Sequence, residues 1–139
     1  MIVINGEGLI VGRVATFAAK KALNGETIRI INCDKMYVTG NKEFLISDTH
    51  RKRIQGTWSK GPHFFRQPDR FVRRIIRGML PYKTSRGLEA YRRVMCYIGA
   101  PDEYKNQNPI TIQTASINKV PSLKYLTVAE ICKHMGAKF

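Results

Sequence analysis

The chain has 139 residues, of which 43% are hydrophobic and 24% are charged. This length and balance exclude a disordered chain and suit one domain with its own core, so we predict a single domain over residues 1–139. Lysine and arginine number 24 against 10 acidic residues, a formal net charge of +14. Such an excess repels itself unless a polyanion neutralises it, so we expect an anionic partner.

The sequence contains few residues that support metal or redox chemistry. Cys33, Cys96 and Cys132 form no CxxC pair, and the three histidines lie far apart. This spacing predicts no disulfide framework, zinc site or catalytic triad, so we expect buried free thiols, no metal, no cofactor and no catalytic residue. There is no signal-peptide pattern and no apolar run long enough to span a bilayer. We therefore expect a cytoplasmic protein with no membrane partner.

The first thirty residues have the pattern strand, helix, strand. Residues 2–4 and 28–31 are short apolar runs, and the apolar residues between Val11 and Asn24 recur on one helical stripe. A unit of this kind crosses over right-handedly and builds a parallel sheet. The fold class is therefore predicted to be α/β.

Two helices are expected to flank an irregular loop in the middle of the chain. The first begins after Asn41, which suits an N-cap, and ends near Ile54. Glycine and proline punctuate residues 55–68, which we interpret as an extended functional loop. Pro68 suits the first turn of the second helix, which should end near Met79.

Shorter elements are expected in the last third of the chain. Ser85 is a candidate cap for a short helix, and residues 94–98 and 110–112 have strand-like apolar patterns. Thr127 and Glu130 have the spacing of a capping box, which predicts a final helix.

The positive charge is concentrated between residues 51 and 93. This stretch holds 13 lysines and arginines against Asp69 and Glu89, a net +11, whereas the other 96 residues hold 11 against 8. A local excess is typical of nucleic-acid-binding surfaces. The side chains that we expect to bind RNA are Arg51, Lys52, Arg53, Lys60, Arg66, Arg70, Arg73, Arg74, Arg77, Lys83 and Arg86.

The helix expected over residues 69–79 separates apolar from basic side chains. One face carries Phe71, Val72, Ile75, Ile76 and Met79, and the other carries Arg70, Arg73, Arg74 and Arg77. A merely solvated face usually mixes lysine with glutamate, but this one has no acid after Asp69. Because the planar guanidinium matches two phosphate oxygens at once, the stripe is interpreted as a backbone-binding face.

The loop before this helix interleaves basic and aromatic residues. Its members are Trp58, Lys60, His63, Phe64, Phe65 and Arg66. The composition fits a loop that grips an RNA backbone and stacks on unpaired bases. The aromatic rings suit anchoring on the protein's own core equally well, so both interpretations stay open.

A turn near the N-terminus supports an alternative function. Gly6, Gly8 and Gly12 lie between strand and helix, and Asp34 occupies the place of a ribose-binding acid, as in a small nucleotide-binding α/β protein. The spacing is GxGxxxG rather than GxGxxG, however, and such turns need glycine whatever they bind. A third hypothesis, a DNA-compacting protein, uses the same positive charge.

Several blocks resemble the ribosomal protein L13 (uL13) family. They are Gly12-Arg13, the stretch Val-Thr-Gly-Asn-Lys at 38–42, Arg-Gly-Met-Leu-Pro-Tyr-Lys-Thr at 77–84 with Arg86-Gly87, and Tyr-Ile-Gly-Ala-Pro at 97–101. The resemblance covers most of the chain, and residues 83–87 are similar to the archaeal and eukaryotic branch. The chain ends at Phe139 without the long extension typical of eukaryotic members, so an archaeal type is expected.

This resemblance implies a fold and a function. The family has a three-layer α/β/α fold around a mostly parallel sheet of about four strands. Its members are structural constituents that bind large-subunit rRNA and neighbouring ribosomal proteins, with no cofactor, no small-molecule substrate and no reaction. By resemblance, Arg77, Lys83 and Arg86 belong to the rRNA-facing surface.

Overall fold

A three-stranded parallel sheet forms the centre of the computed structural model, which describes residues 1–105 and 107–139. The strands are β1 (Ile2–Asn5), β2 (Ile28–Ile31) and β4 (Val94–Cys96), in the order β1-β2-β4. Ile4 pairs with Ile30, and Ile30 with Cys96, so apolar side chains are aligned across one face. The predicted α/β class with a mostly parallel sheet is confirmed, although this sheet has three strands and β4 ends before residues 97 and 98.

One face of the sheet is covered by α1 (Val11–Leu23), α3 (Pro68–Gly78) and α4 (Ser85–Arg93). Ile4, Ile28 and Ile30 are fully buried beneath them. The buried stripe of α1 contains four alanines, whose small side chains let this helix approach α3 and α4 closely. The sequence pattern thus produces the main core on this face.

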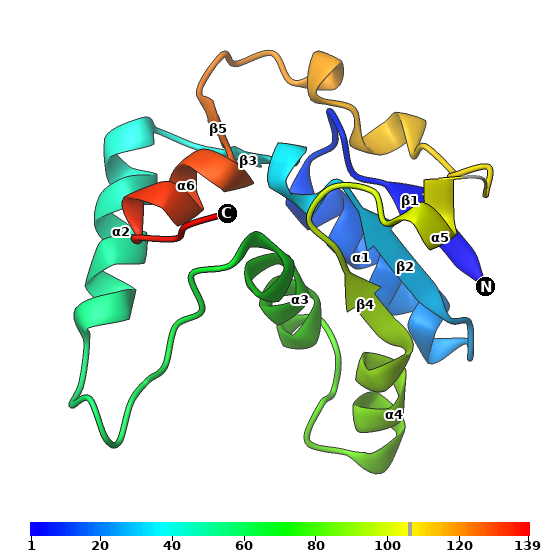
Figure 1. Cartoon of the computed structure of the whole chain (residues 1–139), viewed down its shortest axis with the longest axis horizontal. Coiled ribbons are helices and arrows are strands. Elements are labelled where there is room, and N and C mark those ends of the chain that lie inside the picture. Colours follow the sequence, from blue (N-terminus) through cyan, green and yellow to red (C-terminus); the bar gives the residue numbers. More distant parts are fainter. Residues whose placement is uncertain (106) are drawn as a thin grey trace.

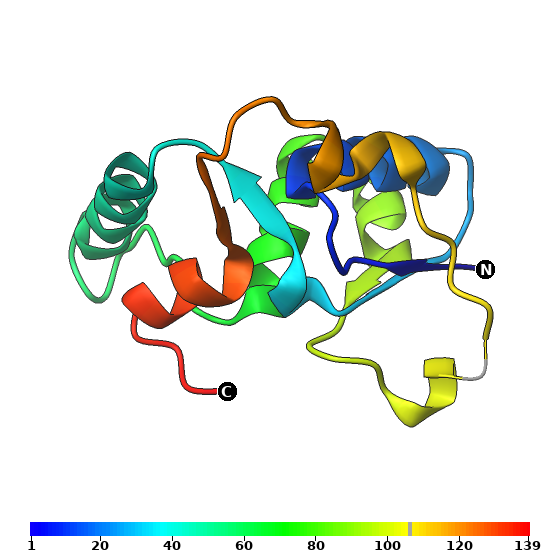
Figure 2. The same cartoon turned by 90° about the horizontal axis from the view of Figure 1, so that it is seen from above.

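The other face carries a thinner layer, which contains α5 (Asp102–Lys105) (Figures 1 and 2). The rings of Tyr97 and Tyr104 lie 5.3 Å apart there. Ile110 donates to the Val3 carbonyl and accepts from the Asn5 amide, at 2.8 and 3.2 Å. The strand expected at 110–112 is wrong, because this single bridge is followed by a turn of 3-10 helix at Gln113–Ala115.

A second, antiparallel pair joins β3 (Tyr37–Thr39) to β5 (Tyr125–Thr127). Their Tyr37 and Tyr125 rings meet edge to face at 5.1 Å. The sequence did not predict β5, because three residues paired with a partner almost ninety positions away leave no local pattern. The pair leads into α2 (Lys42–Ile54) and α6 (Val128–His134), which pack on each other at one side of the molecule (Figure 1).

The helix caps agree with the sequence prediction only in part. The Thr127–Glu130 capping box is confirmed. Thr84 caps α4 instead of Ser85, since its hydroxyl accepts from the Gly87 amide at 3.2 Å. Asn41 precedes α2 as expected, but its side chain makes no capping hydrogen bond.

The three cysteines are buried free thiols, as predicted. Burial raises the pKa of Cys132 to about 12, and burial also raises the pKa of Cys33. Within the described ranges, no helix is both long and apolar enough to cross a membrane.

Candidate nucleic-acid interface

Helix α3 separates the core from the basic surface. Phe71, Val72 and Ile76 are buried against α1 and the sheet, whereas Arg70 is exposed. Arg73, Arg74 and Arg77 are half-buried at the border between the two faces, and Ile75 is half-buried against the core. Met79, which was expected on the apolar face of this helix, lies beyond the last helical turn and is 42% exposed.

Every arginine of α3 lies over an aromatic ring. The distances from the guanidinium carbon to the ring centre are 5.6 Å for Arg70 over Phe65, 4.4 Å for Arg73 over Tyr91, 4.5 Å for Arg74 over Phe64 and 5.0 Å for Arg77 over Tyr82. Stacking restrains a guanidinium through its flat face, while donors at its edge can still reach an anion. The sequence showed the arginines and the aromatic residues but gave no means of pairing them.

These contacts hold the flanking segments against the helix. Phe64 and Phe65 come from the preceding loop, Tyr82 from the following turn and Tyr91 from α4. Arg74 also donates to the His63 carbonyl at 2.7 Å. The four arginines of α3 therefore organise both neighbouring basic segments around one helix.

The sequence left two roles open for the aromatic residues of the preceding loop, stacking on RNA bases and anchoring the loop on the core. Phe64 packs edge-on against the buried Phe71, with ring centres 6.1 Å apart, and so anchors the loop on the core. Trp58 is 93% exposed and makes no aromatic ring contact within residues 1–105 and 107–139. Anchoring on the core thus applies to Phe64 but not to Trp58.

The turn after α3 presents Lys83 and Arg86 to solvent. The Thr84 amide and hydroxyl both donate to the Pro81 carbonyl, at 2.9 and 2.8 Å, which closes the turn. A Cβ atom on Gly87 would lie 2.0 Å from that same carbonyl oxygen, so only glycine allows α4 to pack here. Both basic side chains are thereby held next to the C-terminal end of α3.

The basic residues at the end of α2 have partners within the protein. Arg51 and Lys52 both pair with Asp48, and the hydrogen bond from Lys52 is the main cause that lowers the pKa of that carboxyl. Surface ion pairs usually contribute little to stability. Arg53 donates to the Met135 carbonyl and so links α2 to the end of α6.

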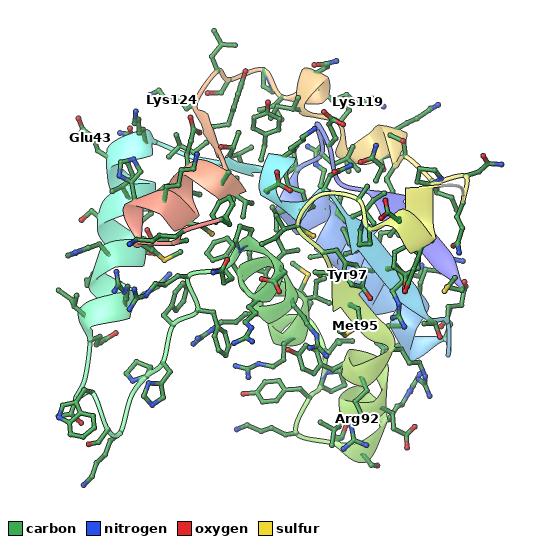
Figure 3. The ribbon with its side chains drawn as sticks, viewed as in Figure 1. Glu43, Arg92, Met95, Tyr97, Lys119 and Lys124 are labelled. Atoms are coloured by element: carbon green, nitrogen blue, oxygen red, sulfur yellow. The ribbon has the colours of Figure 1, made fainter. Side chains whose placement is uncertain are left out.

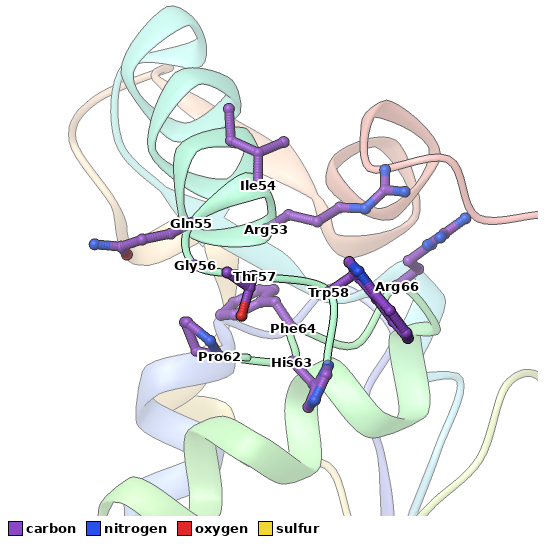
Figure 4. A pocket seen from close by; sticks show the side chains of 10 residues that line it. All are labelled: Arg53, Ile54, Gln55, Gly56, Thr57, Trp58, Pro62, His63, Phe64 and Arg66. Carbon is purple, nitrogen blue, oxygen red and sulfur yellow. The ribbon is translucent and has the colours of Figure 1, made fainter. Parts of the chain in front are cut away.

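Lys60 and Arg66 lie in the loop between α2 and α3. A tight turn begins this loop, where the Gly61 amide donates to the Thr57 carbonyl at 2.9 Å. Between the turn and the end of α2 is a cavity of about 390 Å³, whose lining includes Arg53, Trp58 and Arg66 (Figure 4). The loop is thus shaped around an open space.

The glycine turn has structural explanations that do not involve a nucleotide. A Cβ atom on Gly6 would lie 2.8 Å from Cγ of Met36, and Gly8 has a positive φ of 73°. Asp34 accepts a hydrogen bond from the Gly99 amide at 3.0 Å, so it holds a loop of the protein. The Ala115 carbonyl accepts from the Ile10 amide at 2.8 Å, which brings the chain across the entrance to α1.

By its fold and this surface, the chain is a basic α/β protein in which one helix carries a row of arginines stacked on aromatic rings. Among residues 1–105 and 107–139, there is no cluster of histidine, cysteine or acidic side chains that would hold a metal. Comparison with known proteins gives the particular family. The sequence model of the family "Ribosomal protein L13" matches residues 1–103 of this chain.

Relatives along the whole chain support the same assignment. The "Large ribosomal subunit protein uL13" of Methanocaldococcus jannaschii is 43% identical over 143 residues, covering 100% of both chains. That of Methanococcoides burtonii is 38% identical over 139 residues, again covering 100% of both. That of Archaeoglobus fulgidus is 40% identical over 135 residues, covering 96% of this chain and 86% of the relative. This chain belongs to the ribosomal protein L13 family.

Family membership confirms several of the sequence predictions. The resemblance is confirmed, and these three relatives are archaeal, in agreement with the expected archaeal type. The family consists of structural ribosomal proteins and is not a class of enzymes. Ribosomal proteins work on the ribosome in the cytoplasm, so the predicted location is also confirmed.

Proposed function

We propose that this chain, as one domain over residues 1–139, is a structural constituent of the large ribosomal subunit. Its relatives carry that subunit in their names. The partners would be large-subunit rRNA and neighbouring ribosomal proteins. In this proposal the basic face of α3 and the loops beside it bind the RNA backbone and stabilise the folded subunit.

The observation that carries this proposal is the stacking of all four α3 arginines on aromatic rings. A free arginine loses rotamer entropy when it binds a phosphate, and a stacked one has already lost part of it. Arg70 is exposed like Lys83 and Arg86, and Arg77 lies over the ring of Tyr82, which directly precedes Lys83. The side chains that we assign to RNA are Arg51, Lys52, Lys60, Arg66, Arg70, Arg73, Arg74, Arg77, Lys83 and Arg86, with Arg53 divided between RNA and α6.

The salt dependence of binding tests this assignment. Replacing Lys83 and Arg86 together by Gln removes two exposed cations without disturbing a hydrogen bond or an ion pair that the structure shows. Each lost phosphate contact reduces the slope of log K against log salt by about 0.7 to 0.9. The double variant should therefore bind a large-subunit rRNA fragment with a slope that is flatter by about 1.4 to 1.8.

The matched control replaces Lys119 and Lys124 by Gln. Both are exposed lysines, and Figure 3 shows them at the opposite edge of the molecule from Arg92 of α4. The control removes the same charge but should leave the salt slope unchanged. Equal slopes for both double variants would show that charge alone, and not this face, governs binding to RNA.

A further inference from the structure

The cavity between the end of α2 and the turn at residues 57–61 has an unusual aromatic wall. Trp58 is the single tryptophan of the chain, and 93% of it is exposed. Burying an aromatic side chain of this kind removes roughly 150 to 250 Å² of surface from water, and this burial is favourable. The exposed ring of Trp58 is therefore available to pack against a partner.

The basic side chains around the cavity favour an anionic partner. Arg53, His63 and Arg66 are among its lining residues, and no aspartate or glutamate is among them. Arg66 is exposed and has no hydrogen bond or ion pair within residues 1–105 and 107–139. An anionic group at the entrance would supply a partner for this guanidinium.

The cavity is built before any ligand arrives. A Cβ atom on Gly56 would lie 2.0 Å from the Gly61 carbonyl oxygen, so the two arms of the turn are in close contact. On the other side, Phe64 is held between the Phe71 ring and the Arg74 guanidinium. Both walls are thus fixed, and the volume of about 390 Å³ is within the range of roughly 300 to 1,000 Å³ that small-ligand sites occupy.

We propose that this cavity receives one unpaired nucleotide of RNA, whose base stacks on Trp58 and whose phosphate pairs with Arg66. Figure 4 shows both side chains among the residues that line the cavity. The inference rests on the proposed function, because it names the form of RNA that one part of the basic surface recognises. Arg53 contributes positive potential from the other wall, while its bond to Met135 keeps it in place.

The emission of Trp58 tests the proposal directly, because no other tryptophan contributes. The full chain is titrated with hexa-adenylate RNA and with an abasic hexaribonucleotide of the same backbone charge, and occupancy is followed by anisotropy of a fluorescein label. Hexa-adenylate should quench Trp58 in a saturable way. The abasic strand should quench it far less at equal occupancy.

Substitutions separate stacking from charge. Trp58→Ala should weaken hexa-adenylate binding about 5- to 100-fold, the effect of losing one stacked base. Trp58→Phe keeps a ring and should retain most of the affinity. Phe44→Ala is the matched control, because Phe44 is an exposed ring of α2 outside the cavity lining and stacks on none of the α3 arginines. It should change the affinity by less than about twofold, in contrast to the loss of a stacked base.

Three outcomes would overturn the proposal. They are unchanged affinity in Trp58→Ala, equal quenching by the abasic strand, and equal quenching by a hexaglutamate peptide, which would make the cavity a site for an acidic protein. In the first two cases the salt slope of the Lys83 and Arg86 variant still tests the proposed function separately. Absence of binding by either oligonucleotide at low salt would also overturn the nucleotide proposal, and the salt slope measured with the large-subunit rRNA fragment would still test the proposed function.

Discussion

The guanidinium of Arg74 lies over the ring of Phe64, with 4.5 Å between its central carbon and the ring centre. The same side chain donates to the His63 carbonyl at 2.7 Å. Phe64 in turn contacts the buried Phe71. One arginine of the basic face thus connects the loop at residues 55–67 to the core, and its role in the fold can be tested apart from RNA.

We expect Arg74→Gln to loosen this loop without unfolding the domain. The substitution removes both the cation–π contact and the hydrogen bond to His63, while Gln remains a good helix former. Limited trypsin digestion should cut after Lys60 and Arg66 several times faster than in the unchanged protein, at nearly the same melting temperature.

Arg70→Gln serves as the control for Arg74. Arg70 stacks on Phe65 at the longer distance of 5.6 Å and makes no hydrogen bond to the loop in the part of the chain described. Its variant should be digested at close to the original rate. If Arg74→Gln were cut no faster than Arg70→Gln, the loop would not depend on Arg74.

The two adjacent isoleucines of α3 should differ in their contribution to stability. Ile76 is fully buried, whereas Ile75 is half-buried at the edge of the core. Ile76→Ala should lower the free energy of unfolding by about 2 to 5 kcal/mol, because it removes buried groups and leaves a cavity. Ile75→Ala should cost less, since part of its side chain stays in water. Urea denaturation measures both, and a larger loss at Ile75 would mean that α3 is rotated about its axis relative to this structure.

The capping box of α6 should make part of the stability depend on pH. The Thr127 amide and hydroxyl donate to Glu130, each at 2.9 Å, and the amide bond is the main cause that lowers the pKa of this carboxyl below its ordinary 4.5. Because the folded pKa is depressed, the contribution is fully present above pH 4.5 and is lost as the pH falls through the folded value. The stability advantage over Glu130→Gln should therefore be largest near pH 7 and shrink below pH 4.5.

Thr127→Ala provides a second measurement on the same cap. It removes the hydroxyl that accepts from the Glu130 amide at 3.2 Å and should cost about 0.5 to 2 kcal/mol at neutral pH. Thermal melts between pH 7 and 3.5 follow both variants. A difference between Glu130→Gln and the unchanged protein that stayed constant over this range would argue against an ionised cap.

The three thiols should be unreactive in the folded protein. The thiolate is the reacting species, and burial raises the pKa of Cys132 to about 12 and also raises that of Cys33. With Ellman's reagent at pH 8 we expect slow release in the native state and rapid reaction of three thiols in denaturant. Fast reaction of one thiol in the folded protein would show that a cysteine is accessible.

Elements with a local residue pattern could be predicted from the amino-acid sequence. The apolar runs at residues 2–4 and 28–31 became β1 and β2, and the alanine-rich stripe between them became α1. The apolar and basic residues of 68–78 separated onto two faces of α3 because a helix repeats every 3.6 residues. The excess of positive charge and the family blocks were likewise visible in the chain alone.

The contacts between side chains could not be predicted in this way, because they depend on how distant segments pack in the folded chain. Tyr91 and Phe64 are 27 positions apart, yet both stack on arginines of one helix, because α4 and the preceding loop pack on either side of α3. Short β5 and the choice of Thr84 as a cap also depend on contacts that no local pattern encodes. Arg53 shows the same limit: it is one of three consecutive basic residues in the sequence, but only the fold brings it to the end of α6, because packing and not sequence distance selects its partner.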